Sequence, residues 1–266
     1  MTTALATRRD YLDAARRTII ARSIAGSLAG ALPVPFLDDW AVTAIVGAGY
    51  RKIALSHGVD LDDDAIKALV HGTSGPPSLV DIAAGGIIMR VAGRAAKRMM
   101  LAVAAINRAR SAAKTFTRMT LFDHYCAKLH VGLALDRETA YALREAIDRT
   151  IENTPGALAF HPFRRAAAGA FRAAMRAPLE LADMASGGRV RKLLAKKSGE
   201  VTEPEVVDEL DQAIETALAN KTGFLSRSVA SVEVQLSADA NPYLDAAIEN
   251  LDRRWRARIA ALGQKK

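Results

Sequence analysis

Two apolar arms, rich in Gly and Ala and joined by a proline turn, constrain the fold of this chain more than any other feature. The stretch is LAGALPVPFLDDWAVTAIVGAGY, residues 28–50, and Pro33 and Pro35 end its first arm. As helices, the arms 19–32 and 40–50 would be about 21 Å and 16 Å long, because a helix rises 1.5 Å per residue. The hydrocarbon core of a bilayer is about 30 Å thick. Neither arm is therefore long enough to cross it.

The turn between the arms carries two adjacent carboxylates, Asp38 and Asp39. A carboxylate at mid-membrane costs about 2.5 to 3.5 kcal/mol, which disfavours insertion of the turn into lipid. At the start of the second arm the same group can accept the unpaired amides of a helix. Gly26 and Gly30 would let the two arms approach closely. The sequence thus predicts a tightly packed αα-hairpin whose turn is formed by Pro33, Pro35, Asp38 and Asp39.

The hairpin and the residues after it resemble a known family. A small-residue helix runs into a Pro-x-Pro turn with an Asp, and the second helix ends in a basic pair followed by a Gly-Val-Asp-Leu element. The matching positions are Pro33, Pro35, Asp38, Arg51, Lys52, Gly58, Val59, Asp60 and Leu61. The pattern is similar to the helical domain of unknown function in YcjF-like bacterial inner-membrane proteins, which is also attached to some Era-type GTPases, and to EcsC-like proteins.

This resemblance is confined to residues 1–150. It implies a membrane-associated helical module of bacteria and brings no catalytic residues with it. The expected location is the cytoplasm, at the inner face of the cytoplasmic membrane.

Helical periodicity runs through nearly the whole chain. Half of the residues are hydrophobic but only 5% are aromatic, which is typical of closely packed helices. The stretch SVEVQLS, residues 231–237, fits a half-buried strand as well as a helix, and we favour the helix because no second strand is available to pair with it. The expected helices are 8–32, 39–57, 63–71, 79–117, 119–132, 137–152, 162–184, 203–220 and 242–262.

Several helix ends have local signals. The run DLDDD, residues 60–64, lacks the glycine and the closing glutamate of a calcium-binding loop and is interpreted as the cap of a helix that begins near Ala65. Asp136 is the expected cap of the helix RETAYALREAIDRTI, and residues 154–156 (Thr-Pro-Gly) end that helix. The proline in Asn241-Pro242 is expected to open the last helix.

The predicted fold class is all-α, a multi-helix globular bundle built around the Gly/Ala-rich αα-hairpin with an acidic and then a basic helical C-terminal segment. The run SGGRVRKLLAKKSGE marks a linker. The expected organisation is a helical core domain over 1–185, a basic linker over 186–202 and a C-terminal helical segment over 203–266.

Charge is segregated along the chain, whose formal net charge is +8. Residues 78–128 and 157–199 each carry nine cations and two acids, whereas residues 200–252 carry twelve acids and two cations. The tail from Arg253 carries six cations and no acid. An acidic segment between basic ones can fold back on its own protein or on a neighbouring copy.

A basic helix follows the hairpin, and its cations gather on one side. On a helical wheel they fall within about 100° of one another, opposite an apolar side. The candidate contacts to an anionic surface are Arg90, Arg94, Lys97, Arg98 and Arg108. Such a helix can lie on an anionic membrane, follow a phosphate backbone, or pair with the acidic segment. The lack of aromatic residues among the cations disfavours nucleic acid.

Recognisable catalytic chemistry is missing from the sequence, which contains no P-loop, dinucleotide-binding glycine run or nucleophile elbow. The single cysteine, Cys126, excludes an internal disulfide and is expected to be buried. Asp123, Cys126 and His130 would share a helical face, but no second ligand group with metal-like spacing accompanies them. The remaining histidines considered are expected at helix ends or turns, as polar surface or capping residues, namely His57, His71 and His161. No cofactor, metal or catalytic residue is therefore predicted.

The sequence favours a non-enzymatic, peripheral membrane-associated scaffold that binds an anionic membrane surface or another helical protein. The alternatives are a soluble helical protein that assembles into a homo-oligomer and a non-specific nucleic-acid-binding protein. An enzyme is the least supported class.

Overall fold

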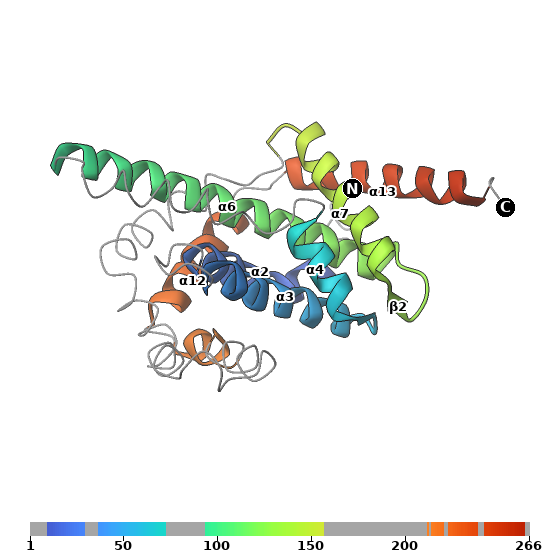
Figure 1. Ribbon diagram of the computed structural model, residues 1–266, viewed down its shortest axis with the longest axis horizontal. Coiled ribbons are helices and arrows are strands. Elements are labelled where there is room, and N and C mark those ends of the chain that lie inside the picture. The colour runs from blue at the N-terminus through green and yellow to red at the C-terminus, as the bar shows by residue number, and fades with distance from the viewer. Residues whose placement is uncertain are drawn as a thin grey trace.

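The computed structural model describes residues 10–29, 37–72, 94–156, 212, 214–220, 223–238 and 242–263, and these are mostly helical (Figure 1). The all-α prediction is confirmed. The helices are α2 (Asp10–Ala29), α3 (Leu37–Ser56), α4 (Asp63–His71), α6 (Arg94–Lys128), α7 (Arg137–Asn153), α12 (Phe224–Ala238) and α13 (Pro242–Gly263). The strands are β1 (Asp60–Leu61) and β2 (Ala134–Leu135).

The two arms of the opening stretch form the helices α2 and α3, which pack against each other and against α6. A Cβ atom built on Gly26 would lie 2.9 Å from Cγ2 of Val46, so the glycine allows the close approach of α2 and α3 that the sequence predicted. Arg22 of α2 is fully buried and donates a hydrogen bond of 3.1 Å from Nη1 to the carbonyl of Ile45 in α3. The hairpin is thus held by apolar packing together with this buried polar contact.

Two aspartates cap the helices that follow the turns, as expected from the sequence. Asp62 accepts a hydrogen bond of 2.6 Å from the amide of Ala65 at the start of α4. Asp136 accepts one of 2.8 Å from the amide of Thr139 at the start of α7. Each carboxylate also lies at the positive end of its helix dipole. The expected starts of both helices are therefore confirmed.

A short parallel pairing of β1 with β2 was not predicted. Asp60 lies opposite Ala134 and Leu61 opposite Leu135, and the amide of Asp60 donates a further hydrogen bond of 2.7 Å to the carbonyl of Leu133. Two-residue strands have no alternating pattern long enough to be read in a sequence. The pairing joins the corner after α3 to the corner after α6.

The break expected between helices 79–117 and 119–132 is wrong, because α6 continues through this point to Lys128. Thr117 and Thr120 donate hydrogen bonds from their hydroxyls to the carbonyls of Ala113 and Phe116, four residues earlier in each case. These bonds satisfy the hydroxyls inside the helix, so the threonine-rich stretch does not interrupt it. The first residues of the expected helix 79–117 and the whole of 162–184 lie outside the described residues.

The helix prediction for residues 231–237 is confirmed, because these residues belong to α12. In the expected helix 203–220, residues 214–219 are helical, and the last helix begins at Pro242 as predicted. Leu225, Val229 and Val232 of α12 join the same hydrophobic cluster as α2, α3 and α6. Leu251 and Trp255 of α13 also belong to it. The described C-terminal helices therefore share the core of the N-terminal ones.

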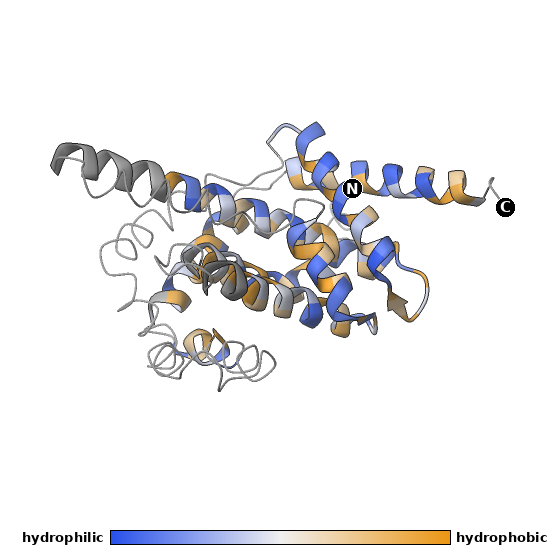
Figure 2. Cartoon of the chain, in the orientation of Figure 1, coloured by the Kyte–Doolittle hydropathy of each residue, from blue (hydrophilic) through white to orange (hydrophobic). Residues whose placement is uncertain are grey.

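Among the described residues, no helix combines the length and the apolar character needed to cross a membrane. In Figure 2, hydrophilic and hydrophobic residues are mixed along most of the helices.

Candidate functional site

The residues predicted to contact an anionic surface lie on, or before, the N-terminal part of α6. Arg94, Lys97, Arg98 and Arg108 belong to this one helix. The side chains of the first three lie outside the described residues, as does the whole of Arg90. In the hairpin turn, Pro33 and Pro35 are outside the described residues, and Asp38 and Asp39 fall in the first turn of α3. That helix begins at Leu37, two residues earlier than expected.

The helix α6 has a basic first half and a buried second half. Residues 94–110 contain five cations and no acid, and the first acid of the helix is Asp123. Ile106 is 40% exposed and Arg108 is half-buried, whereas Ala109, Ala112 and Phe116 are buried. The helix has 35 residues, so it is about 52 Å long at 1.5 Å per residue. One end can therefore be anchored in the core while the other extends to the end of the molecule (Figure 1).

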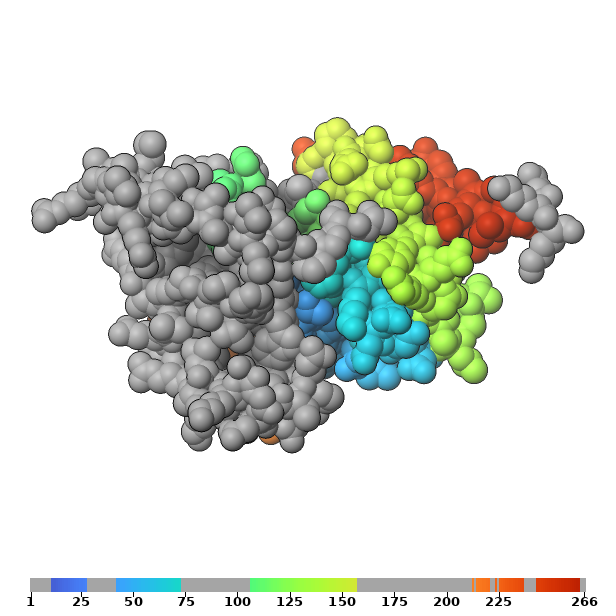
Figure 3. All heavy atoms as spheres, in the orientation of Figure 1, coloured from blue at the N-terminus to red at the C-terminus, as the bar shows by residue number. Residues whose placement is uncertain are grey.

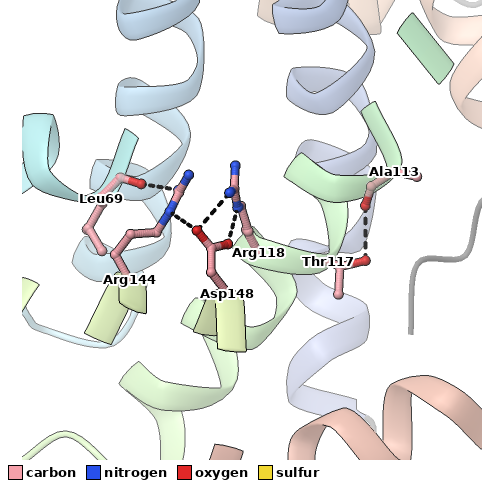
Figure 4. Close-up of polar contacts among 6 residues, drawn as sticks. All are labelled: Leu69, Ala113, Thr117, Arg118, Arg144 and Asp148. Carbon is pink, nitrogen blue, oxygen red and sulfur yellow. Dashed lines mark hydrogen bonds and ion pairs between the residues drawn. The ribbon is translucent and has the colours of Figure 1, made fainter. Parts of the chain in front are cut away.

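Where α6 enters the core, an ion network joins it to α4 and α7 (Figure 4). Arg118 donates two hydrogen bonds to Asp148, of 2.7 Å from Nε to Oδ1 and 2.8 Å from Nη2 to Oδ2. Arg144 donates from Nε to the same carboxylate at 3.0 Å, and from Nη1 to the carbonyl of Leu69 at the end of α4. One carboxylate thus bridges two guanidinium groups that are largely buried.

Burial and the charges of this network act together on the pKa values of the groups around it. Burial opposes the ionisation of Asp148, but its hydrogen bond with Arg118 and the charges of Arg118 and Arg144 lower the pKa of this carboxyl. Burial, together with the charge of Arg118, lowers the pKa of Lys114. Burial raises the pKa of Tyr50. The network therefore holds an ionised carboxylate among excess positive charge, which suits a structural role.

This network was not predicted from the sequence. Only the spacing of Arg144 and Asp148, four residues apart on one helix, could have indicated part of it. Arg118 is 30 positions from Asp148, and nothing local connects the two.

Two histidine–aspartate pairs lie further along α6. His57 lies 2.6 Å from Asp123, through Nε2 and Oδ1, so its expected role as a surface or capping residue is wrong. Asp123 is fully buried, and burial raises its pKa. The next residue, His124, lies 2.6 Å from Oδ1 of Asp252 in α13 through Nε2 and 2.6 Å from the hydroxyl of Tyr11 through Nδ1. These contacts fasten α2, α3 and α13 to α6.

His71 and His161 were also expected at the surface or at helix ends. His71 is in the last turn of α4 and lies 2.8 Å from the hydroxyl of Thr43 through Nε2. It is partly buried there. His161 lies outside the described residues.

The described polar groups do not form a metal centre or an activated nucleophile. Among the described residues, no three His, Cys, Asp or Glu side chains are placed to hold a metal ion. Cys126 is buried as expected, and burial raises the pKa of its thiol, so the reactive thiolate is disfavoured. Burial lowers the pKa of His130, which favours the neutral imidazole.

A small cavity lies between α2, α6, α12 and α13. Its lining includes Leu12, Phe116, Thr120 and Leu236. At about 40 Å³ it has room for water molecules and not for a metabolite. It is therefore not a candidate substrate site.

Comparison of the chain with protein-family models, with curated protein sequences and with solved structures gives no match.

Proposed function

We propose that this protein is a non-catalytic helical scaffold that associates peripherally with an anionic membrane surface through the basic first half of α6. The observation that carries this proposal is the continuity of α6 from Arg94 to Lys128. Because the helix is unbroken, the positions Arg94, Lys97, Arg98 and Arg108 fall on one face of it.

The charge of this region supports a polyanionic surface as its partner. Residues 94–110 carry five cations without a single acid, and each cation near an anionic membrane contributes about 1 kcal/mol. The buried second half of α6 anchors this face to the rest of the protein. The resemblance of residues 30–66 to membrane-associated helical domains points in the same direction.

Flotation of the full chain with lipid vesicles tests the proposal. We expect the protein to float with vesicles that contain phosphatidylserine and not with pure phosphatidylcholine vesicles, and binding should weaken as salt screens the charges. The double variant Arg94→Glu/Arg98→Glu should lower the affinity about thirtyfold or more, since two contributions of about 1 kcal/mol are lost.

A charge-matched control separates the α6 face from net charge alone. Lys67 on α4 and Arg227 on α12 are exposed, and the variant Lys67→Glu/Arg227→Glu changes the net charge by the same amount. This control should keep most of the vesicle binding. Equal losses in both variants, or no flotation with anionic vesicles at low salt, would contradict the proposal. Retention on duplex DNA without flotation would favour a nucleic-acid-binding protein instead.

A further inference from the structure

Two exposed surfaces of opposite charge lie at the end of the molecule remote from the first turns of α6. One is the α13 end, residues 253–263. The other is the acidic corner, residues 55–64 and 129–138, where the end of α3, β1, β2 and the connection before β2 meet. Figures 1 and 3 show the last turns of α13 and the β2 region at the same end of the long axis.

The apolar side of α13 that faces the core is continued by exposed apolar residues in the last turns of the helix. Leu251 and Trp255 are buried, whereas Ile259 and Leu262, at the next helical spacings of four and three, are 53% and 54% exposed. Arg254 and Arg258 lie along one side of this apolar stripe, and Arg256 lies on the other side. Residues 253–263 contain four arginines and no acid. The stripe is thus an apolar surface bordered by positive charge.

The acidic corner has the complementary character. Leu55, Val131 and Leu133 are 64%, 91% and 83% exposed. The corner is held together by hydrogen bonds from the amide of Gly58 to the carbonyl of Leu55 and from the amide of Asp60 to the carbonyl of Leu133. Figure 2 shows hydrophobic residues in the connection before β2.

The two segments that carry these apolar residues also carry an excess of acids. Residues 55–64 and 129–138 carry six acids and one cation, Arg137. Of the acids, Asp63 is paired with Arg51 at 2.7 Å. Asp60 and Asp64 are exposed, and the charge of Asp64 also acts on Arg137. An anionic membrane would repel this corner, whereas a cationic amphipathic helix fits it.

We propose that the α13 end of one copy docks on the acidic corner of a second copy, and the reverse, in a two-fold symmetric dimer. Both surfaces lie at one end of the molecule, so a two-fold axis brings each α13 end to the partner's corner and closes the assembly. The four arginines face the excess of carboxylates, and the stripe of Ile259 and Leu262 covers the exposed apolar side chains. The dimer uses the end opposite the first turns of α6 and does not rest on the proposed function.

Sedimentation equilibrium of the full chain over a range of concentrations tests the dimer. We expect a monomer–dimer equilibrium that shifts toward monomer as salt increases. The variant Arg254→Glu/Arg258→Glu should weaken association about tenfold or more, because like charges then face each other. The variant Asp60→Lys/Asp64→Lys should do the same. Neither aspartate is the residue that caps α4, so the fold is expected to be kept, and circular dichroism checks this.

Mixing the two variants gives the decisive result. In the mixed dimer the glutamates on the α13 end of the first variant face the lysines of the second, and the arginines of the second variant face the aspartates of the first. Both contacts regain opposite charges, so association should return to the wild-type level in the mixture alone. A separate variant, Ile259→Ser/Leu262→Ser, should weaken association without any change of charge.

Three outcomes would overturn the proposal. The wild-type chain could stay monomeric at all concentrations at low salt, or the mixture of the two variants could associate no better than each variant alone. The wild-type chain could also form oligomers larger than a dimer whose size increases with concentration. Vesicle flotation of the Arg254→Glu/Arg258→Glu variant should be unchanged, so failure of the dimer and failure of membrane association are told apart.

Discussion

At the residue scale, Asp148 is the most consequential polar side chain of the described core. Its carboxylate accepts hydrogen bonds from both Arg118 and Arg144, and the side chain of Arg144 is 8% exposed. Removing the shared partner of buried charges costs far more than breaking a surface pair, because the remaining charges stay desolvated. We expect Asp148→Asn to lower the free energy of unfolding by about 3 kcal/mol, measured by urea denaturation.

The exposed pair of Arg149 with Glu145 on the same helix provides the matched control. Glu145→Gln should change the free energy of unfolding by about 0.5 kcal/mol or less, because solvent screens this pair. Similar losses in the two variants would show that the Asp148 network is not stabilising.

The same carboxyl makes stability depend on pH. The pKa of Asp148 is lower in the folded protein than its ordinary value of 3.8, so the unfolded chain binds the proton more tightly. The stabilisation from this group is complete above pH 4 or so, and it is lost as the pH falls through the lower, folded pKa. We expect the urea midpoint of the wild type to fall in this acidic range more steeply than that of Asp148→Asn. Parallel curves for the two proteins would contradict the assignment.

At the element scale, the hairpin of α2 and α3 depends on the close approach at Gly26. A Cβ atom there would lie 2.9 Å from Cγ2 of Val46, a β-branched side chain with little freedom to move. Overpacking of this kind typically costs 1 to 3 kcal/mol. We expect Gly26→Val to lower the free energy of unfolding by about 2 kcal/mol in urea denaturation.

Gly263 at the end of α13 is the control for this substitution, since a Cβ atom there meets no other atom within 4 Å. Gly263→Val should leave stability within about 0.5 kcal/mol of the wild type, as at other exposed sites. A Gly26→Val protein as stable as this control would mean that the two helices can move apart without cost.

The apolar arms of this hairpin are covered by other helices of the same chain. The buried faces of α2 and α3 are covered by each other and by α6, and α12 also packs against α2. The apolar composition of residues 28–50 is therefore compatible with a hydrophobic core formed by helices alone.

At the scale of the whole molecule, acids from the segment 200–252 contact α2, α3 and α6. Glu215 lies 2.6 Å from Nζ of Lys52 and 3.8 Å from Nη2 of Arg22, and Asp252 pairs with His124. Trp255 of α13 packs edge-on against Tyr125 of α6, with ring centroids 5.0 Å apart. These contacts tie the C-terminal helices to the core.

If α6 and α13 open as one unit, removing Trp255 should weaken both. We expect Trp255→Ala to lower the free energy of unfolding by about 3 to 5 kcal/mol, the range for a buried aromatic residue. Hydrogen exchange should show equal loss of protection in peptides covering 116–126 and 247–255. Loss confined to the α13 peptide would show instead that the C-terminal helix opens by itself.

The sequence by itself determined most of the described helices and several of their ends. The caps Asp62 and Asp136, the helix over 231–237 and the burial of Cys126 follow from neighbours a few residues away, because capping and helical periodicity are local properties. The break wrongly expected in α6 also has a local cause. Threonines weaken the helical pattern of the sequence, but the sequence does not show that their hydroxyls bond to carbonyls of the same helix.

Only the tertiary structure decided which side chains meet. His57 pairs with Asp123 across 66 positions, and Lys52 pairs with Glu215 across 163. The pairing of β1 with β2, and the position of the α13 end and the acidic corner at the same end of the long axis, arise in the same way. Such contacts depend on how the helices pack, and packing is determined by the combined fit of many side chains rather than by the spacing of any pair along the chain.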